Sequence, residues 1–203
     1  MSQKPFTIVC LGDSITCNWN EKSYVDYWQQ LFDKQKESVN VIGAGINGET
    51  AQDGYYRLDR DVITYQPDLV TIMFGHNDAD PPRNISPVLF ANYLRKIINY
   101  LQHNSKANIW LLTPNQLGDE QYNQRYEPYV EMIKQACADK KVYFVDLFDV
   151  FSDQNLDDIF TYSIASSYIR GEGKDWIHPN QQGQELIAQK LLIEFKAQFD
   201  QTK

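Results

Sequence analysis

The sequence predicts an α/β domain of three layers, in which helices cover both faces of a parallel sheet. Five short runs are almost continuously apolar, as expected of strands buried on both faces: Phe6–Leu11, Val39–Gly43, Leu69–Phe74, Asn108–Thr113 and Val142–Asp146. Amphipathic stretches lie between these runs. Apolar residues at helical spacing mark two of them, Leu94, Ile97, Ile98 and Leu101 in one and Ala188, Leu192, Phe195 and Phe199 in the last. Strands that alternate with helices favour right-handed crossovers within one sheet.

The length and composition fit a single domain. The chain has 203 residues, enough to bury a sizeable core, with 42% hydrophobic and 23% charged residues, as in ordinary globular proteins. No internal repeat or linker divides it. One connection is unusually long: residues 147–175 show weak periodicity, several aromatic residues and a pair of glycines. Because connections of this length usually have a function, the segment is predicted to form a lid or a specificity wall.

The charge and the cysteines limit the partners and the compartment. The net charge is −8 and no Lys/Arg cluster stands out, which argues against nucleic acid or an anionic membrane as the main partner and favours a neutral substrate. No apolar stretch approaches the length that spans a membrane. The three cysteines are scattered and the N-terminus lacks the layout of a signal peptide. These features predict a cytoplasmic protein without disulfides or a zinc site.

Polar residues follow the first and third predicted strands. Ser14 in "LGDSIT" stands where a strand turns into a helix, so its hydroxyl can be exposed and its own N–H free. A lone serine there is more often a helix N-cap, and that alternative stays open. Asn77 in "FGHND" offers an amide with two N–H donors, although an Asx-turn at the strand end is the more common role of such an asparagine considered alone.

Asp175 and His178 in "DWIHPNQQG" are three residues apart, so their side chains can meet on one side of a turn. A histidine that activates a serine needs an acceptor on its other ring nitrogen, and Asp175 is suited to this. Of the two other histidines, His76 is a competing base without an acid in helical register. His103 lies in the polar end of a helix and is expected to be solvated.

The segment "GAGING", residues 43–48, has the G-x-G-x-x-G pattern of dinucleotide-binding proteins. That interpretation is weak, because the glycines follow the second strand and no acidic residue ends the strand that comes next. Gly43 and Gly45 are instead expected to let the chain turn off the strand. Gly48, just before a predicted helix start, can direct a backbone N–H at an anion.

These features meet at the carboxyl ends of the strands, where ligands bind in open α/β sheets. Together they supply a nucleophile, a base with its orienting carboxylate, and N–H donors for an oxyanion. Considered as a set, they favour acyl transfer by a serine nucleophile.

Four blocks in this order, "GDSIT", "INGET", "GHND" and "DWIHPN", resemble the SGNH hydrolases, also called GDSL-type esterases and lipases. The resemblance covers nearly the whole chain. It implies a flavodoxin-like α/β/α sandwich with strand order 2-1-3-4-5, and ester hydrolysis that requires no metal or organic cofactor.

The resemblance also implies roles for individual residues. Ser14 matches the nucleophile, His178 the general base and Asp175 the residue that orients the histidine. The backbone N–H groups of Ser14 and Gly48 and the side-chain amide of Asn77 match the oxyanion hole. Two positions depart from the usual pattern: Ile15 stands where leucine is common, and the bulky Trp176 lies between Asp175 and His178.

The expected substrates are small carboxylic esters, such as short-chain acyl esters or acetylated sugars. Trp176, Tyr168 and Asp13 are expected to contact the substrate. Other aromatic residues in or near the loops are candidates for stacking on a sugar or lining an acyl pocket, although helix packing explains Tyr55 and Tyr56 equally well: Trp19, Tyr24, Tyr55, Tyr56, Phe160 and Tyr162.

Alternatives with the same catalytic residues are a lysophospholipase and a thioesterase. A non-catalytic binding module is disfavoured, because it would be expected to have lost Ser14 or His178, and both are present. A nucleotide-binding module remains the least favoured interpretation.

Overall fold

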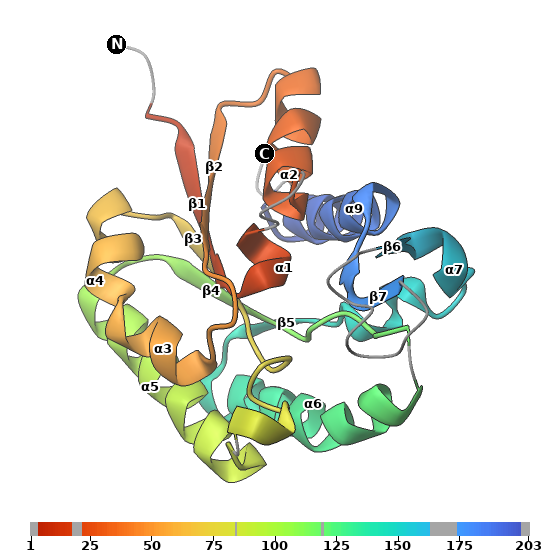
Figure 1. The fold of residues 1–203 in the computed structure, drawn as a ribbon. Helices are drawn as coiled ribbons and strands as arrows, with labels where there is room; N and C mark the ends of the chain where they lie inside the picture. Colours follow the sequence, from red (N-terminus) through yellow and green to blue (C-terminus); the bar gives the residue numbers. More distant parts are fainter. Residues whose placement is uncertain (1–3, 18–21, 84, 119, 163–173, 200–203) are drawn as a thin grey trace.

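The fold is centred on a parallel sheet of five strands in the order β2-β1-β3-β4-β5, which confirms the expected topology (Figure 1). The computed structural model describes residues 4–17, 22–83, 85–118, 120–162 and 174–199. The strands are β1 (Phe6–Gly12), β2 (Val39–Gly45), β3 (Leu69–Met73), β4 (Asn108–Leu112) and β5 (Tyr143–Val145). Their ends differ from the predicted runs by one or two residues.

Helices cover both faces of the sheet (Figure 1). One face carries α3 (Ala51–Tyr56), α4 (Leu58–Asp61), α5 (Pro87–Asn104) and α6 (Glu120–Lys140). The other carries α1 (Ser14–Cys17), α2 (Tyr24–Lys34), α7 (Leu156–Ile159) and α9 (Gln181–Phe199). Short 3₁₀ turns lie at Ile63–Tyr65, Pro81–Arg83 and Phe148–Phe151.

The apolar runs of the strands contribute to two separate cores. In β1, Val9 and Leu11 belong to the core on the α3–α6 face, and Ile8 and Cys10 to the core on the α2–α9 face. All four side chains are fully buried. Successive residues of a strand point to opposite faces, so continuous apolar runs are what a sheet covered on both sides requires.

Helix α9 buries the face that its apolar spacing predicts. Ala188 and Phe195 are in the core together with Ile187 and Leu191, and Leu192 is half-buried at its edge. The ring of Phe195 packs at right angles to that of Trp28 in α2 and closes the core between the two helices. This packing places the N-terminal end of α9, and the segment before it, beside α1.

Strand β2 continues further than predicted. Gly43 lies inside the strand, paired with Cys10 of β1, so the expected turn at this glycine is wrong. Gly45 is the last strand residue, and α1 passes very close to it: a Cβ atom there would lie 2.4 Å from the backbone N of Cys17. The missing side chain lets the backbone of α1 lie against the end of β2.

The first part of segment 147–175 is packed into the protein and is not a lid. Leu147, Phe151, Ile159 and Phe160 are buried in the core beneath α9. The segment also forms β6 (Phe160–Tyr162), which pairs antiparallel with β7 (Lys174–Pro179) in a small second sheet that the sequence does not predict. Residues 163–173, including Tyr168, lie outside the described residues.

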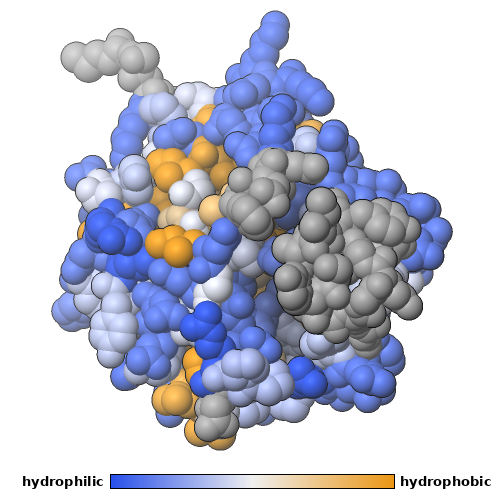
Figure 2. All heavy atoms as spheres, in the orientation of Figure 1, coloured by the Kyte–Doolittle hydropathy of each residue, from blue (hydrophilic) through white to orange (hydrophobic). Residues whose placement is uncertain are grey.

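The surface in the view of Figure 2 is mainly hydrophilic. Exposed apolar side chains at the beginning of α5 are Val88, 65% exposed, and Leu89, 41% exposed. Within the described ranges, none of the helices combines the length and apolar character needed to cross a lipid bilayer.

Candidate active site

Ser14 is the first residue of α1, directly after the turn at the end of β1. The cap of this short helix is Asp13: its Oδ1 accepts the N–H of Ile15 at 3.0 Å, and its backbone oxygen accepts the N–H of Cys17 at 3.0 Å. The alternative that Ser14 is the N-cap is therefore wrong, because the neighbouring aspartate fills that place. The Ser14 hydroxyl is free to face β7.

His178 connects Ser14 to Asp175. Its Nε2 lies 2.8 Å from Ser14 Oγ, and its Nδ1 lies 2.7 Å from Asp175 Oδ2. An ionised carboxylate only accepts hydrogen bonds, so Nδ1 carries the ring proton and Nε2 is left to accept the serine hydroxyl. The three side chains come from the start of α1 and from β7, and the structure joins them as the spacing predicts.

Asp175 is fixed by more than the histidine. Its Oδ1 accepts the backbone N–H groups of Ile177, at 2.9 Å, and His178, at 3.1 Å, so the carboxylate cannot rotate freely. Burial raises the pKa of Asp175, but the hydrogen bond from His178 and these two N–H groups outweigh it, and the pKa lies below its ordinary value. Asp175 is therefore ionised at neutral pH.

Asn77 joins the loops that follow β1, β2 and β3. Its Nδ2 donates to the backbone oxygen of Glu49 at 2.9 Å and, more weakly, to Asp13 Oδ2 at 3.4 Å. Glu49 follows Gly48 in the chain, and Asp13 precedes Ser14. Gly48 has φ +75°, a left-handed conformation that favours glycine. The backbone N–H groups of Ser14 and Gly48 donate to no acceptor among the described residues.

Asp13 does not occupy a substrate-facing position. Its side chain is 2% exposed, beneath the loops that it connects. Burial raises the pKa of Asp13 to about 6, opposed by the N–H of Ile15 and the charge of His178. Asp13 is thus not placed for the expected substrate contact, and its carboxylate instead accepts hydrogen bonds from Ile15 and Asn77.

The N-terminus of α3, where the glycine pattern ends, is already occupied by acidic side chains. Thr50 is the N-cap of α3 and exchanges hydrogen bonds with Asp53. The N–H of Ala51 donates to Asp78 Oδ1 at 3.1 Å. Dinucleotide sites use such N–H groups for phosphate, and two carboxylates there disfavour a second anion. The geometry thus contradicts the nucleotide-binding alternative.

Asp78 yields a prediction about stability and pH. Its side chain is 1% exposed, and burial raises the pKa of Asp78 to about 7. The folded state then holds a proton that the unfolded chain releases near pH 4, so stability falls as the pH rises from about 4 to about 7. Asp78→Asn removes this titration. Between pH 4 and pH 7.5, the free energy of unfolding of the variant should rise relative to that of wild type by up to about 4 kcal/mol, which denaturant unfolding measures. If the difference in unfolding free energy between Asp78→Asn and wild type stayed constant from pH 4 to pH 7.5, a raised pKa of the buried Asp78 carboxyl would be contradicted.

His76 is not positioned as a base for Ser14. Its Nε2 donates to the backbone oxygen of Asn115 at 3.0 Å, and its ring packs against Tyr126 with centroids 4.7 Å apart. Burial lowers the pKa of His76 to about 3, so the imidazole is neutral. His103, in contrast, is exposed near the end of α5, as expected.

A cavity of about 300 Å³ lies beside Asn77. Its wall includes Asn77 and Ile177, the apolar and aromatic side chains of Leu117, Tyr122 and Tyr126, and the charged residues Asp80 and Arg125. Its lining is mainly apolar and aromatic. The cavity therefore adjoins the candidate oxyanion donor Asn77, whereas Ser14 and His178 are not among its lining residues.

Most of the aromatic residues expected at the site are used elsewhere. Tyr24 and Phe160 are fully buried core residues, and the ring of Trp176 packs 6.2 Å from that of Phe160, centroid to centroid. Tyr55 packs against Tyr56 and against α5, which supports the packing alternative for this pair. Trp19 lies outside the described residues, as does Tyr168, and nothing is described of the side chain of Tyr162.

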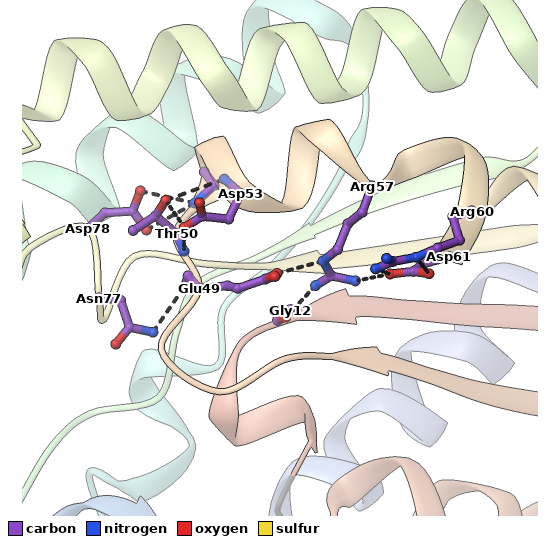
Figure 3. Close-up of polar contacts among 10 residues, drawn as sticks. Gly12, Glu49, Thr50, Asp53, Arg57, Arg60, Asp61, Asn77 and Asp78 are labelled. Atoms are coloured by element: carbon purple, nitrogen blue, oxygen red, sulfur yellow. Dashed lines mark hydrogen bonds and ion pairs between the residues drawn. The ribbon is translucent and has the colours of Figure 1, made fainter.

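Two residues near the site have no motif to indicate their role. Arg57 and Glu49 form an ion pair of 2.5 Å between the end of α3 and the loop after β2 (Figure 3). Arg57 is only 6% exposed. The sequence signal for this role is weak. It consists of an arginine on the helix after the glycine block, with Asp61 four residues further on as an ion-pair partner.

Comparison with known proteins agrees with this architecture. Residues 10–186 match the model of the GDSL-like lipase/acylhydrolase family. A thioesterase 1/protease 1/lysophospholipase L1 of Escherichia coli is 28% identical over 182 residues, which cover 90% of this chain and 79% of that protein. An acetylxylan esterase of Geobacillus stearothermophilus is 28% identical over 166 residues, covering 77% of this chain and 72% of that protein.

Solved structures agree as well. The crystal structure of a lipase/acylhydrolase from Enterococcus faecalis superposes with a TM-score of 0.77 at 28% sequence identity, over 94% of this chain and 95% of the other. The family match includes the segments that carry Ser14, Asn77 and His178. The chain therefore belongs to the GDSL-like lipase/acylhydrolase family and is a carboxylic ester hydrolase by class.

Proposed function

We propose that this protein hydrolyses small carboxylic esters with Ser14 as nucleophile, His178 as general base and Asp175 as the residue that orients His178. The observation that carries the proposal is the continuous line of hydrogen bonds from Ser14 Oγ to His178 Nε2, 2.8 Å, and from His178 Nδ1 to Asp175 Oδ2, 2.7 Å. This arrangement matches the geometry that serine hydrolases need for proton transfer.

In the first step, His178 Nε2 takes the hydroxyl proton while Ser14 Oγ attacks the ester carbonyl carbon. The imidazolium that forms is stabilised by the ionised carboxylate of Asp175. The carbonyl oxygen becomes a tetrahedral oxyanion, which needs hydrogen-bond donors already in place.

The proposed donors are the backbone N–H groups of Ser14 and Gly48 and the side-chain amide of Asn77. The amide of Asn77 has two N–H groups. The 2.9 Å hydrogen bond to the backbone oxygen of Glu49 fixes the plane of the amide, whereas the 3.4 Å contact with Asp13 Oδ2 is at the limit of a hydrogen bond. The weakly held hydrogen is the one that can donate to the oxyanion.

The tetrahedral intermediate then collapses, and His178 gives its proton to the leaving alcohol oxygen. This leaves an acyl group on Ser14 Oγ. A water molecule then reacts in the same way: His178 takes its proton while its oxygen attacks the acyl carbon, and His178 gives that proton to Ser14 Oγ as the bond from Oγ to the acyl carbon breaks and the acid is released.

The size of the cavity supports small substrates. At about 300 Å³, it stands at the lower end of the range for ligand pockets. Its apolar and aromatic lining beside Asn77 suits a short acyl group or a sugar ring. The acetylxylan esterase among the relatives acts, by its name, on a substrate of this kind.

Asn77→Ala tests the oxyanion hole. Loss of one donor raises the barrier by about 3–4 kcal/mol, so kcat should fall by roughly two to three orders of magnitude while KM changes little. Steady-state hydrolysis of p-nitrophenyl acetate measures both constants. If KM rises instead and kcat is preserved, Asn77 binds the ground state and is not an oxyanion donor.

A substrate series tests the proposed specificity. The p-nitrophenyl esters from acetate to palmitate, acetylated xylose, an acyl thioester and a lysophospholipid should be compared by kcat/KM. The proposal predicts the highest values for acetate to butyrate esters and for acetylated xylose. Because one relative is named a thioesterase and lysophospholipase, a preference for the thioester or the lysophospholipid would favour that second candidate function.

A further inference from the structure

A buried arginine connects the loops that carry the proposed oxyanion donors. Arg57 ends α3 and makes three contacts with different parts of its guanidinium group (Figure 3). Nε pairs with Glu49 Oε2 at 2.5 Å, Nη2 donates to the backbone oxygen of Gly12 at 3.0 Å, and Nη1 donates to Asp61 Oδ2 at 3.1 Å. Two of these three acceptors, Gly12 at the end of β1 and Glu49 in the loop after β2, lie next to segments of the candidate active site.

Each of these two acceptors lies close in the chain to a proposed donor. Gly12 is two residues before Ser14, and Glu49 directly follows Gly48. Glu49 also holds the third donor, because its backbone oxygen accepts the amide of Asn77 at 2.9 Å. Glu49 thus contacts Arg57 with its side chain and Asn77 with its backbone, and Figure 3 shows these contacts as one continuous chain.

Other contacts also hold the loop between β2 and α3: Arg83 Nη2 donates to the backbone oxygen of Gly48 at 2.8 Å, and the amide of Asn77 donates to that of Glu49 at 2.9 Å. The loop's own backbone bonds near Gly48 are long, 3.2 Å from the N–H of Ile46 to Gly12 and 3.3 Å from the N–H of Glu49 to Ile46. Gly48 itself has the conformational freedom of glycine. The 2.5 Å bond from the buried guanidinium to Glu49 is charge-assisted, and the same guanidinium donates to Gly12, so Arg57 connects this loop to the end of β1.

We propose that Arg57 and Glu49 are positioning residues of the oxyanion hole: together they fix the N–H of Gly48 and the amide of Asn77 relative to Ser14. The inference rests on the proposed function, in which these groups stabilise the oxyanion. Arginine is needed because its planar guanidinium reaches three acceptors in fixed directions, whereas lysine presents one compact charge.

Arg60 provides a matched control. It binds the same Asp61 through Nε, at 2.6 Å, and Nη2, at 2.8 Å, but makes no described contact with Gly12 or Glu49. Arg57→Lys and Arg60→Lys are the same chemical change on the same ion-pair network. Because Arg57 is 6% exposed and Arg60 71% exposed, a merely structural role predicts that activity falls only as far as each variant loses folded protein, which thermal unfolding of both variants measures.

The kinetic test compares both variants with wild type on p-nitrophenyl acetate, with active sites counted by a fluorophosphonate. For Arg57→Lys, kcat per active site should fall about 10-fold with KM nearly unchanged, because displaced donors mainly weaken the transition state. The inhibition constant of a boronic acid, which forms a tetrahedral adduct at a serine, should rise in proportion. Arg60→Lys should stay within about 2-fold of wild type in both measurements.

Three further variants test whether the effect of Arg57 passes through Glu49 and Asn77. Glu49→Gln keeps the shape and the acceptor oxygen, so it should lose less activity than Glu49→Ala. In an Asn77→Ala background, Arg57→Lys should cause a smaller loss than in wild type, because the two changes act on the same group. Fully additive losses, or equal losses in Arg57→Lys and Arg60→Lys, would overturn the inference.

A readout without catalysis separates this inference from the proposed function. In ¹H–¹⁵N spectra, Arg57→Lys should shift the side-chain amide of Asn77 and the backbone N–H of Gly48, and Arg60→Lys should leave both unchanged. Unchanged signals in Arg57→Lys would overturn the positioning role. If Arg57→Lys causes these shifts but the wild-type protein hydrolyses none of the esters, the proposed function is contradicted instead.

Discussion

Ser14→Ala should lower kcat for ester hydrolysis by about 10⁶-fold, close to the uncatalysed background. The hydroxyl lies 2.8 Å from His178 Nε2, and within the described residues no second hydroxyl or thiol shares that contact. Without it, no acyl-enzyme can form, and the remaining groups act only through binding and oxyanion stabilisation. The measurement is steady-state hydrolysis of p-nitrophenyl acetate with highly purified variant.

The change should leave the fold intact, because the cap of α1 is provided by Asp13 and not by Ser14. Thermal unfolding of the variant is the control and should match wild type. Cys17, exposed at the end of the same helix, offers a second control: Cys17→Ala should retain full activity. A Ser14→Ala variant with more than a thousandth of wild-type kcat would show that another nucleophile acts.

Asp175→Asn should lower kcat by about 10⁴-fold, the second-largest effect. Asp175 Oδ1 accepts two backbone N–H groups, from Ile177 and His178. An asparagine must keep its oxygen at that position to satisfy them, which turns its NH₂ group toward His178 Nδ1. The histidine then carries its proton on Nε2 and can no longer accept the proton of Ser14.

This prediction is specific to the orientation of the carboxylate. Asp175→Asn should fold as stably as wild type near neutral pH, within about 1–2 kcal/mol, because its shape and backbone bonds are retained. Nitrogen-15 chemical shifts of His178 report the tautomer directly, and they should move from the Nδ1–H to the Nε2–H form. Retention of more than a tenth of wild-type kcat would contradict the role of Asp175.

The sheet and the residues at its edge could be predicted because local patterns determine them. Buried strands require continuous apolar runs, and the topology of parallel strands brings the residues that follow them to one edge. Ser14, Asn77 and the Asp175–His178 pair each follow a strand end or precede the last helix. Their meeting is therefore a consequence of the fold, and the family blocks add the order in which they occur.

Other features depend on contacts between distant residues, which local patterns do not specify. The segment after β5 looks like a loop because its apolar residues lack a clear period, yet Phe151 and Phe160 fill the core under α9. Its strand β6 is recognisable only through its pairing with β7. Likewise, the side chain of Arg57 reaches back eight residues to Glu49 and 45 residues to Gly12, so no spacing rule indicates this contact.

The central claim is that Ser14 is a nucleophile activated by His178. The most direct measurement is treatment of wild type and His178→Ala with a fluorophosphonate, followed by mass mapping of the labelled peptide. Stoichiometric labelling of Ser14 in wild type, and its loss in the folded His178→Ala variant, is the predicted result. No labelling of wild type, labelling at another residue, or equally rapid labelling of both proteins would contradict the proposed mechanism.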